Sequence, residues 1–403
     1  MKYVLILGDG MADYPLSQLD DKTPLQYAKK PNIDFLAQNA EVGMVKTVPD
    51  GIPPGSDAAN LSVMGYDTKL YYTGRSPLEA VSMGISLSDT DVALRCNLVT
   101  LSEDEKYEDK TMIDYSSDEI SSEEARELIQ EINNHFKNHI FCFYPGISYR
   151  HCVVWDKGQV GLSLTPPHDI LEKKITSYLP KGDNNKILLD MMVRSYDILK
   201  DHPVNKARIA RGLRPANSIW LWGEGKRPSI PKFYDKYKIT GSVISAVDLI
   251  KGIGILAGLK NVEVEGATGN IHTNFIGKAL AALEELKSGK DFVYLHIEAP
   301  DECGHRYEIE NKVKSIEIID EQVVGTILKG LEEYDDYRIL ILPDHPTPLA
   351  LRTHTSDPVP FLIYQKSNHK KSGVKGYDEF QAADTNIYFN EGHRLMDHFI
   401  NGK

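Results

Sequence analysis

Three short apolar runs along the chain share one plan: each is rich in Leu or β-branched residues, and each leads into an acidic residue. They are KYVLILGDG (2–10), DFVYLHIEAPD (291–301) and YRILILPDH (337–345). Runs of this length and composition are typical of central strands in a sheet that is covered on both faces. Because sites form at the carboxyl ends of parallel strands, we expect Asp9, Asp301 and Asp344 to converge at one edge of one sheet.

Helical patterns separate these runs. The segments 242–259, 274–286 and 310–334 carry apolar residues at helical spacing, and each is long enough to form a helix. Strands that alternate with helices predict a doubly wound α/β domain with a largely parallel sheet. We therefore predict an α/β fold for most of the chain.

The middle of the chain follows a different pattern. Residues 90–210 are more polar and include a helix-like segment, SSEEARELIQEINNHF (121–136). An apolar, strand-like pattern returns at NSIWLWGEG (217–225). The simplest interpretation is a smaller α+β domain, residues 90–210, inserted into a core that is formed by residues 1–89 and 211–403.

Composition narrows the class of protein and of partner. The chain has 403 residues, of which 41% are hydrophobic and 26% charged, as expected of a globular protein with a sizeable core. Its formal net charge of −12 argues against a broad basic face for nucleic acid. No apolar run approaches the roughly 20 residues of a membrane helix, and the four cysteines lack the spacing of a disulfide or zinc scaffold. We expect a cytoplasmic protein that binds neither nucleic acid nor membrane, and the sequence indicates no oligomeric state.

Residues near two of these strand ends have the chemistry of metal ligands. Asp301 and His305 lie four positions apart, so they share one face if the chain turns helical there, and they could clamp one ion. The alternative is that Asp301 caps a helix and His305 lies in a loop. Asp344, His345 and His354 follow the other strand, and two bridging ions explain the whole set better than one. Carboxylate and imidazole ligands suit Mn²⁺, Zn²⁺, Co²⁺ or Mg²⁺.

A candidate nucleophile stands in the segment GIPPGSDAAN (51–60). Ser56 follows two prolines and a glycine and precedes a helical pattern, which places it at a helix N-terminus where backbone N–H groups favour a phosphate. An ordinary N-cap serine is the alternative interpretation. The residue three positions later is Ala59, so the reciprocal capping box is missing. A bound divalent metal would lower the pKa of such a hydroxyl.

Several short motifs extend through nearly the whole chain: LGDGMADYP, PPGSDAANLSVMGYD, YYTGRSPLEA, DVALRCN, VEGATG, DECGH, and DHPTP with HTSDPVP. In their sequence and order, these motifs resemble the archaeal-type cofactor-independent phosphoglycerate mutases of the alkaline phosphatase superfamily. The resemblance implies a doubly wound, alkaline-phosphatase-like sheet with an inserted smaller α+β domain that binds substrate. It also implies two divalent metal ions per chain, usually Mn²⁺.

The resemblance further implies roles for residues. Two sets of metal ligands follow from it, one for each ion: Asp9, Ser56, Asp344 and His345, and Asp301, His305 and His354. Ser56 would attack the phosphoryl group of 3-phosphoglycerate and become phosphoserine. The group would then return to the 2-hydroxyl of the bound glycerate, which gives 2-phosphoglycerate.

The implied substrate is a small phosphorylated carboxylic acid. Its carboxylate calls for guanidinium groups, which bind carboxylates through two parallel hydrogen bonds. The candidate substrate-binding residues, in or beside the inserted domain, are Arg75, Arg95, Arg150, His151, Arg208, Arg211 and Arg214. For each arginine a solvated basic face is the competing interpretation, and for His151 the alternatives are a proton transfer or a structural role.

Two motifs differ in sequence from the usual form in the family, and the identity of the substrate is therefore undecided. The chain reads APDECGH where ATDEAGH is common, and PDHPTP where ADHSTP is common. This wording resembles a bacterial subgroup that has been proposed to act on homoserine, so homoserine phosphorylation or phosphomonoester hydrolysis on the same metal site is the alternative. The sequence has no G-x-x-x-x-G-K-[ST] loop, which weighs against a conventional kinase. A non-catalytic metal-binding protein is the third hypothesis.

Overall fold

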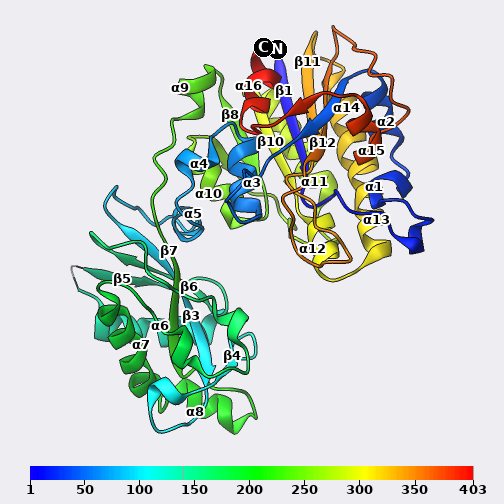
Figure 1. The fold of residues 1–403 in the computed structure, drawn as a ribbon. Helices are drawn as coiled ribbons and strands as arrows, with labels where there is room; N and C mark the ends of the chain where they lie inside the picture. The colour runs from blue at the N-terminus through cyan, green and yellow to red at the C-terminus, as the bar shows by residue number, and fades with distance from the viewer. Residues whose placement is uncertain (139, 403) are drawn as a thin grey trace. The chain divides into compact units, whose positions relative to one another are not determined.

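The computed structural model describes residues 1–138 and 140–402 and divides the chain into two compact units (Figure 1). Unit 1 comprises Met1–Tyr72 and Ile230–Lys403, and unit 2 comprises Thr73–Ser229. Each unit has its own sheet and its own hydrophobic core. In the part of the chain that the structure describes, no helix combines the length and the apolar composition that a membrane span requires.

Unit 1 is built on a mixed eight-stranded sheet in the order β13-β2-β12-β11-β1-β10-β8-β9. The strands are β1 (Lys2–Gly8), β2 (Glu41–Val45), β8 (Gly241–Ile244), β9 (Lys260–Val262), β10 (Phe292–Ile297), β11 (Tyr337–Leu342), β12 (Val359–Gln365) and β13 (Tyr388–Phe389). From β11 to β9 every neighbouring pair is parallel, whereas β12 runs antiparallel to β11 and to β2. The three apolar runs are the adjacent central strands β11, β1 and β10, which confirms them as buried strands.

The register of these strands brings their carboxyl ends level. Gly8, the last residue of β1, lies opposite Ile297 at the end of β10. Leu7 of β1 lies opposite Leu342 at the end of β11. The residues that follow the three strands therefore emerge at the same edge of the sheet, as the sequence predicts.

Helices cover both faces of this sheet (Figure 1). They are α1 (Pro24–Tyr27), α2 (Pro31–Gln38), α3 (Ser56–Val63), α4 (Thr68–Tyr71), α9 (Phe233–Tyr237), α10 (Asp248–Leu256), α11 (Phe275–Lys287), α12 (Ala299–His305), α13 (Ile309–Ile318), α14 (Gly325–Leu331), α15 (Glu379–Asp384) and α16 (Arg394–Asn401). On one face, α11 packs on β10 and β8, and α2 packs on β12. On the other face, Phe399 of α16 contacts Tyr3 of β1 edge-on, and Gly254 of α10 lies close against Val243 of β8. The doubly wound α/β architecture is confirmed.

One predicted helix is partly wrong. The segment 242–259 begins as strand β8, and helix α10 starts only at Asp248. Val243 and Ile244 are β-branched and buried, and the backbone around them pairs with β10. The spacing of the apolar residues did not separate a short buried strand from the first turn of a helix, because both are apolar throughout.

The predicted helix 310–334 forms, but with an interruption. A π-helical turn, Ile319–Val324, separates α13 from α14. Asp320 in this turn accepts hydrogen bonds from the backbone N–H groups of Asn32, at 3.3 Å, and Ile33, at 2.7 Å, at the start of α2. These are N–H groups that a helix leaves without partners of its own, so the turn serves as a cap for a helix far away in the sequence.

Unit 2 has an antiparallel sheet with helices packed on it, which matches the smaller α+β domain predicted from the sequence. Its strands are β3 (Val92–Leu101), β4 (Met112–Asp114), β5 (Phe141–Tyr144), β6 (Arg150–Trp155) and β7 (Ser218–Lys226). Its helices are α5 (Ser76–Ser82), α6 (Ser122–Phe136), α7 (Asn185–Leu199) and α8 (Pro203–Ala210). β3 pairs with β6 and β7 along most of its length and with β4 near its end.

The boundaries of unit 2 differ from those predicted for the inserted domain. The sequence predicts an insert of residues 90–210, whereas the unit spans Thr73–Ser229. At its start, α5 packs on β3 and β7. At its end, the apolar segment 217–225 forms most of β7 and pairs antiparallel with β3. From the sequence, we expect this segment in the larger domain, residues 1–89 and 211–403. An apolar run indicates that a strand is buried, but the partner strand decides the domain to which it belongs.

Candidate metal centre and active site

Three buried aspartates converge where neighbouring strands of unit 1 end. Asp9 follows β1, Asp344 follows β11, and Asp301 lies in α12 just beyond β10. The backbone N–H of Gly10 donates to Oδ1 of Asp344 at 3.2 Å. Gly10 has a φ of 63°, and a Cβ there would lie 2.8 Å from the Cα of Asp301. Only glycine allows the end of β1 to approach α12 this closely.

One candidate ion site is formed by Asp301, His305 and His354. α12 is helical, so the first two side chains share a face as predicted, and Nε2 of His305 lies 3.2 Å from Oδ2 of Asp301. Nε2 of His354 lies 3.3 Å from Oδ1 of the same carboxylate. The two imidazole Nε2 atoms are 3.0 Å apart. The three residues thus offer ligand atoms that all lie within 4.8 Å of one another, which suits a single cation.

The second candidate site is formed by Asp9, Ser56, Asp344 and His345. Nε2 of His345 lies 3.0 Å from Oγ of Ser56, 3.3 Å from Oδ2 of Asp344 and 3.6 Å from Oδ1 of Asp9. Asp9, Asp301 and His345 also offer ligand atoms within 4.8 Å of one another, which connects the two sites. The structure therefore brings all seven predicted ligands into one cluster.

This donor set fits divalent cations. Oδ1 of Asp9 is buried and has no hydrogen-bond partner among the residues that the structure describes, although a buried carboxylate oxygen needs one. Burial raises the pKa of Asp9, and the neighbouring Asp344 and Asp301 raise it further. A cation among these carboxylates would provide the missing partner and offset their mutual repulsion. The orphaned oxygen is the observation that most directly favours a metal.

The histidines of the cluster differ in protonation. Burial lowers the pKa of His345, so its ring is neutral at neutral pH and can act as a ligand. A hydrogen bond to Asp301 raises the pKa of His305 to about 9. Burial disfavours the charge on Asp301, but hydrogen bonds with His305 and His354 outweigh that cost and lower its pKa. A metal at this site must therefore displace a proton from His305.

Ser56 is the first residue of α3, and Gly55 occupies the N-cap position. The hydroxyl of Ser56 faces His345 and does not cap the helix. Nδ2 of the buried Asn60, one turn later, donates both to the carbonyl oxygen of Ser56 and to Oδ2 of Asp344, each at 2.8 Å. The hydroxyl of Tyr294 donates to Oδ1 of Asn60 at 2.6 Å and so fixes the amide. Asn60 thereby fastens the helix of Ser56 to the strand end of Asp344.

Sequence reasoning missed two members of the surroundings, Asn60 and His296. His296 lies in β10, is fully buried, and has its Nε2 3.0 Å from Oδ2 of Asp9. Burial lowers its pKa to about 3. The signal that could have found it is the alternation along β10, because Tyr294 and His296 share one face of a strand that is otherwise apolar.

Three of the predicted substrate-binding arginines are engaged in contacts within unit 2. Arg208 is buried and donates to Glu124 at 2.5 Å and to two backbone carbonyl oxygens. Arg211 pairs with the same glutamate, and Arg214 pairs with Asp114 at 3.1 Å. These partners favour structural roles for Arg208, Arg211 and Arg214 over the predicted role in substrate binding.

The other four candidates have different surroundings. Arg95 makes two hydrogen bonds to Glu79, at 2.8 and 2.7 Å, and Arg75 makes one to the same carboxylate at 3.0 Å. Arg150 is exposed. His151 is buried, and its Nε2 has no hydrogen-bond partner in the described part of the chain. Burial lowers the pKa of His151 to about 3, so its ring is neutral.

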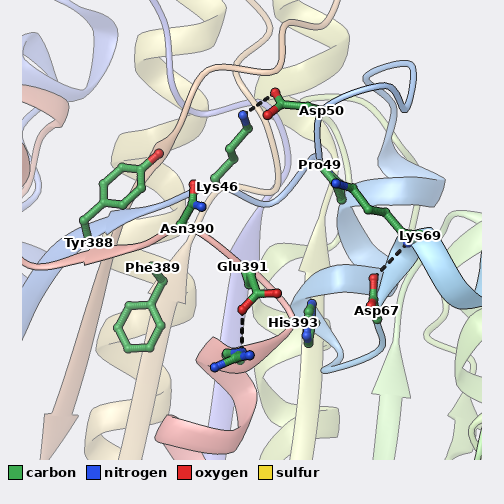
Figure 2. A pocket seen from close by; sticks show the side chains of 12 residues that line it. Lys46, Pro49, Asp50, Asp67, Lys69, Tyr388, Phe389, Asn390, Glu391 and His393 are labelled. Atoms are coloured by element: carbon green, nitrogen blue, oxygen red, sulfur yellow. Dashed lines mark hydrogen bonds and ion pairs between the residues drawn. The ribbon is translucent and has the colours of Figure 1, made fainter.

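A cavity of about 520 Å³ in unit 1 does not coincide with the cluster (Figure 2). Its lining residues come from the segments 46–69 and 388–394, and none of the seven predicted ligands is among them. Lys46 forms an ion pair with Asp50 in its wall. Arg394 pairs with Glu391 at 2.7 Å. Acidic and basic groups are nearly balanced there, so the cavity indicates no preference for an ion of either sign.

Comparison with known proteins identifies the family. The family model described as 2,3-bisphosphoglycerate-independent phosphoglycerate mutase matches residues 37–205. A relative from Geobacter sulfurreducens, named as a probable mutase of this kind, is 50% identical over 397 residues, which cover 98% of this chain and 99% of the relative. This chain belongs to the 2,3-bisphosphoglycerate-independent phosphoglycerate mutase family. Another mutase of the family, from Methanothrix thermoacetophila, is 49% identical over 403 residues and covers 100% of both chains.

Solved structures agree with this membership of the mutase family. The structure of a protein from Pyrococcus horikoshii has a TM-score of 0.83 and 31% identity, and the match covers 99% of this chain and 96% of that one. The cofactor-independent phosphoglycerate mutase from Thermoplasma acidophilum has a TM-score of 0.69 and 26% identity, with coverage of 100% and 99%. The resemblance that the motifs indicate is confirmed.

Proposed function

We propose that this chain is a metal-dependent phosphoglycerate mutase that interconverts 3-phosphoglycerate and 2-phosphoglycerate without 2,3-bisphosphoglycerate. The observation that carries the proposal is the cluster of three aspartates, three histidines and Ser56 at one edge of the sheet. Such a set can hold divalent cations beside a nucleophilic hydroxyl, as phosphoryl transfer requires. Relatives about half identical to this chain over its full length carry the mutase name, which supports the same conclusion.

The proposed metals are two divalent ions, with Mn²⁺ as the first choice and Zn²⁺, Co²⁺ or Mg²⁺ as alternatives that the same ligands accept. The residues that would hold them are Asp9, Ser56, Asp344 and His345 for one ion, and Asp301, His305 and His354 for the other. When bound, such ions supply positive charge to phosphoryl oxygens and lower the pKa of a coordinated hydroxyl.

Ser56 would carry the phosphoryl group between two oxygens of the substrate. Its Oγ, 3.0 Å from Nε2 of His345, forms a bond to phosphorus while the bond from phosphorus to the 3-oxygen breaks. The second half reverses this step toward the 2-oxygen and regenerates the hydroxyl. One proton passes from Ser56 to the released glycerate, and the 2-hydroxyl returns one. Asn60 holds the backbone of Ser56 in place throughout.

Arg150 is our first candidate for the substrate carboxylate. It is exposed, and its guanidinium lies 5.6 Å from the ring centroid of Tyr149 rather than beside a carboxylate of the described residues. Arg75 and Arg95 share Glu79 and are the next candidates, because a guanidinium can exchange one carboxylate for another. His151 would serve as a neutral hydrogen-bonding group through its unpartnered Nε2.

Homoserine phosphorylation and phosphomonoester hydrolysis would use the same cluster. The motif sequence APDECGH is the observation that suggests homoserine phosphorylation. The mutase names of the relatives favour phosphoglycerate over homoserine. We also propose a cytoplasmic enzyme of glycolysis or gluconeogenesis, since its four cysteines are free thiols, which suits a reducing compartment.

The test is an enolase-coupled assay with 3-phosphoglycerate on full-length protein that has been stripped with EDTA and resupplied with Mn²⁺. No 2,3-bisphosphoglycerate is added. We expect formation of 2-phosphoglycerate that depends on the metal and is lost in the Ser56→Ala variant. Ser62→Ala, on the same helix but outside the cluster, is the matched control and should retain activity.

A different result would reject the mutase. Folded protein that binds Mn²⁺ but forms no 2-phosphoglycerate would leave the kinase and phosphatase alternatives. Turnover of ATP with homoserine would then identify the kinase, and net release of inorganic phosphate would identify the phosphatase. Mutase activity that survives in Ser56→Ala would show that Ser56 is not the nucleophile.

A further inference from the structure

A buried series of three hydrogen-bonded polar side chains leads from the end of β8 to the cluster of proposed metal ligands. Oγ of Ser245 lies 3.2 Å from Nδ1 of His296, and Nε2 of His296 lies 3.0 Å from Oδ2 of Asp9. Ser245 and His296 are 3% and 0% exposed, so both side chains are shielded from bulk solvent. The other oxygen of Asp9, Oδ1, has no hydrogen-bond partner among the described residues. His296 therefore contacts one carboxylate oxygen and leaves the other for a cation.

The contacts of His296 with Ser245 and Asp9 favour the tautomer that carries its proton on Nε2. Oγ of Ser245 accepts a hydrogen bond from the backbone N–H of Val247 at 3.0 Å, so its own hydroxyl proton is available to Nδ1 of His296. A neutral imidazole has one N–H, and with Nδ1 as the acceptor that N–H is at Nε2. It then donates to Oδ2 of Asp9. The opposite tautomer would place a lone pair against the carboxylate.

We infer that His296 is a positioning residue, which holds Oδ2 of Asp9 through its Nε2–H and so presents Oδ1 alone to the metal. This inference rests on the proposed function, because it assumes that Asp9 is a metal ligand. In the common arrangement a histidine binds the metal and a carboxylate orients the histidine. Here the roles are exchanged, and the carboxylate binds while the histidine orients it.

The competing role for His296 is that of a metal ligand. Asp9, His296 and Asp344 offer ligand atoms that lie within 4.8 Å of one another. That role needs a lone pair on Nε2, and hence a proton on Nδ1 that Ser245 would have to accept in addition to the N–H of Val247. The two roles predict different Mn²⁺ affinities for a variant that keeps an N–H donor near the position of Nε2 but lacks the imidazole.

The experiment compares full-length His296→Gln and His296→Leu with the wild type. The amide of glutamine can place an N–H near the position of Nε2, whereas leucine has no donor. We expect His296→Leu to weaken one of the two Mn²⁺ binding events by about 10-fold to 100-fold in a calorimetric titration. His296→Gln should bind like the wild type, and its Co²⁺ form should keep the wild-type visible absorption, because the nitrogen ligands are unchanged.

Two results would overturn the inference. Equal losses of Mn²⁺ affinity in both variants, with an altered Co²⁺ spectrum, would make His296 a ligand. Unchanged Mn²⁺ affinity in both would give it no role in metal binding. Ser245→Ala, which removes no proposed ligand, should cause a smaller loss in the same direction, and it keeps the test valid if His296→Leu does not fold.

Failure of the proposed function is distinguishable. A wild-type chain that binds no Mn²⁺ and forms no 2-phosphoglycerate would reject the mutase and the inference together. A wild type that is active and binds Mn²⁺, with variants that bind it equally well, would reject the inference alone. Thermal melting in EDTA, followed by circular dichroism, checks that each variant is folded before its metal affinity is measured.

Discussion

His305 is the residue whose charge most directly couples the metal site to pH. Its pKa is raised to about 9 by the hydrogen bond to Asp301, so in the metal-free protein it carries a proton at neutral pH. A metal must displace that proton. We expect the Mn²⁺ affinity of this site to rise with pH from 7 to 9, by up to about tenfold per unit, and then to level off. Calorimetric titrations in buffers of different ionisation enthalpy would count the released proton.

The stability of the metal-free protein depends on pH in the opposite sense. The folded pKa of His305 lies above its ordinary value of 6.5, so the pair with Asp301 stabilises the fold fully below about pH 6.5 and loses its effect as the pH rises toward 9. His305→Gln should remove this part of both pH dependences. A wild-type affinity for Mn²⁺ that stays constant from pH 7 to 9 would contradict the prediction.

Helices α6 and α8 of unit 2 are joined by a partly buried ion pair. The side chain of Arg208 is only 2% exposed and pairs with Glu124, which also binds the 54% exposed Arg211. We expect Arg208→Met to lower the free energy of unfolding by about 3 kcal/mol, because it leaves one oxygen of the partly buried Glu124 carboxylate and two backbone carbonyl oxygens without their donor. Arg211→Met, from the end of the same helix, should cost less than about 1 kcal/mol. Urea denaturation measures both.

The same pair of variants separates a structural role from substrate binding. If Arg208→Met unfolds like the wild type but raises the KM for 3-phosphoglycerate, the arginine binds substrate as the sequence predicted. If Arg208→Met lowers the free energy of unfolding and leaves the KM of the folded protein unchanged, the role of Arg208 is structural. Its contacts with Glu124 and the backbone then explain the loss of stability.

The whole molecule is divided unequally along the sequence. Unit 2 is one continuous segment, Thr73–Ser229, with its own sheet and core, whereas unit 1 combines two segments and contains all seven proposed ligands. We expect the isolated fragment 73–229 to fold and to melt cooperatively, with a melting temperature that Mn²⁺ does not change. Mn²⁺ at about 100 times its dissociation constant should stabilise the full chain by about 2.7 kcal/mol.

Differential scanning calorimetry with Mn²⁺ and with EDTA tests this division. An unfolded fragment would show that unit 2 depends on unit 1 for its stability. A fragment whose melting temperature rises with Mn²⁺ would place a metal site outside the proposed cluster. The full-length Asp301→Asn variant, which lacks a proposed ligand, should respond to Mn²⁺ less than the wild type does.

Local pattern determined much of this protein. The three apolar runs are strands because short, Leu-rich and β-branched segments favour a buried sheet, and parallel strands place Asp9, Asp301 and Asp344 at one edge. The i, i+4 spacing of Asp301 and His305 gives one face once α12 forms. These features depend on residues near one another in the sequence. The rest of the ligand set is predicted from the resemblance of the motifs to a known family.

Tertiary structure decided what depends on distant partners. His296 and Asn60 lie within a strand and a helix that the local pattern marks only as buried, and their roles come from Asp9 and Asp344, 287 and 284 positions away. β7 belongs to unit 2 because it pairs with β3, and Arg208 donates a hydrogen bond to Glu124, which lies 84 positions before it. The pattern of apolar and polar residues indicates which side chains are buried away from water. It does not indicate which hydrogen-bond or strand partner each residue meets, because distant partners come together only when the chain folds.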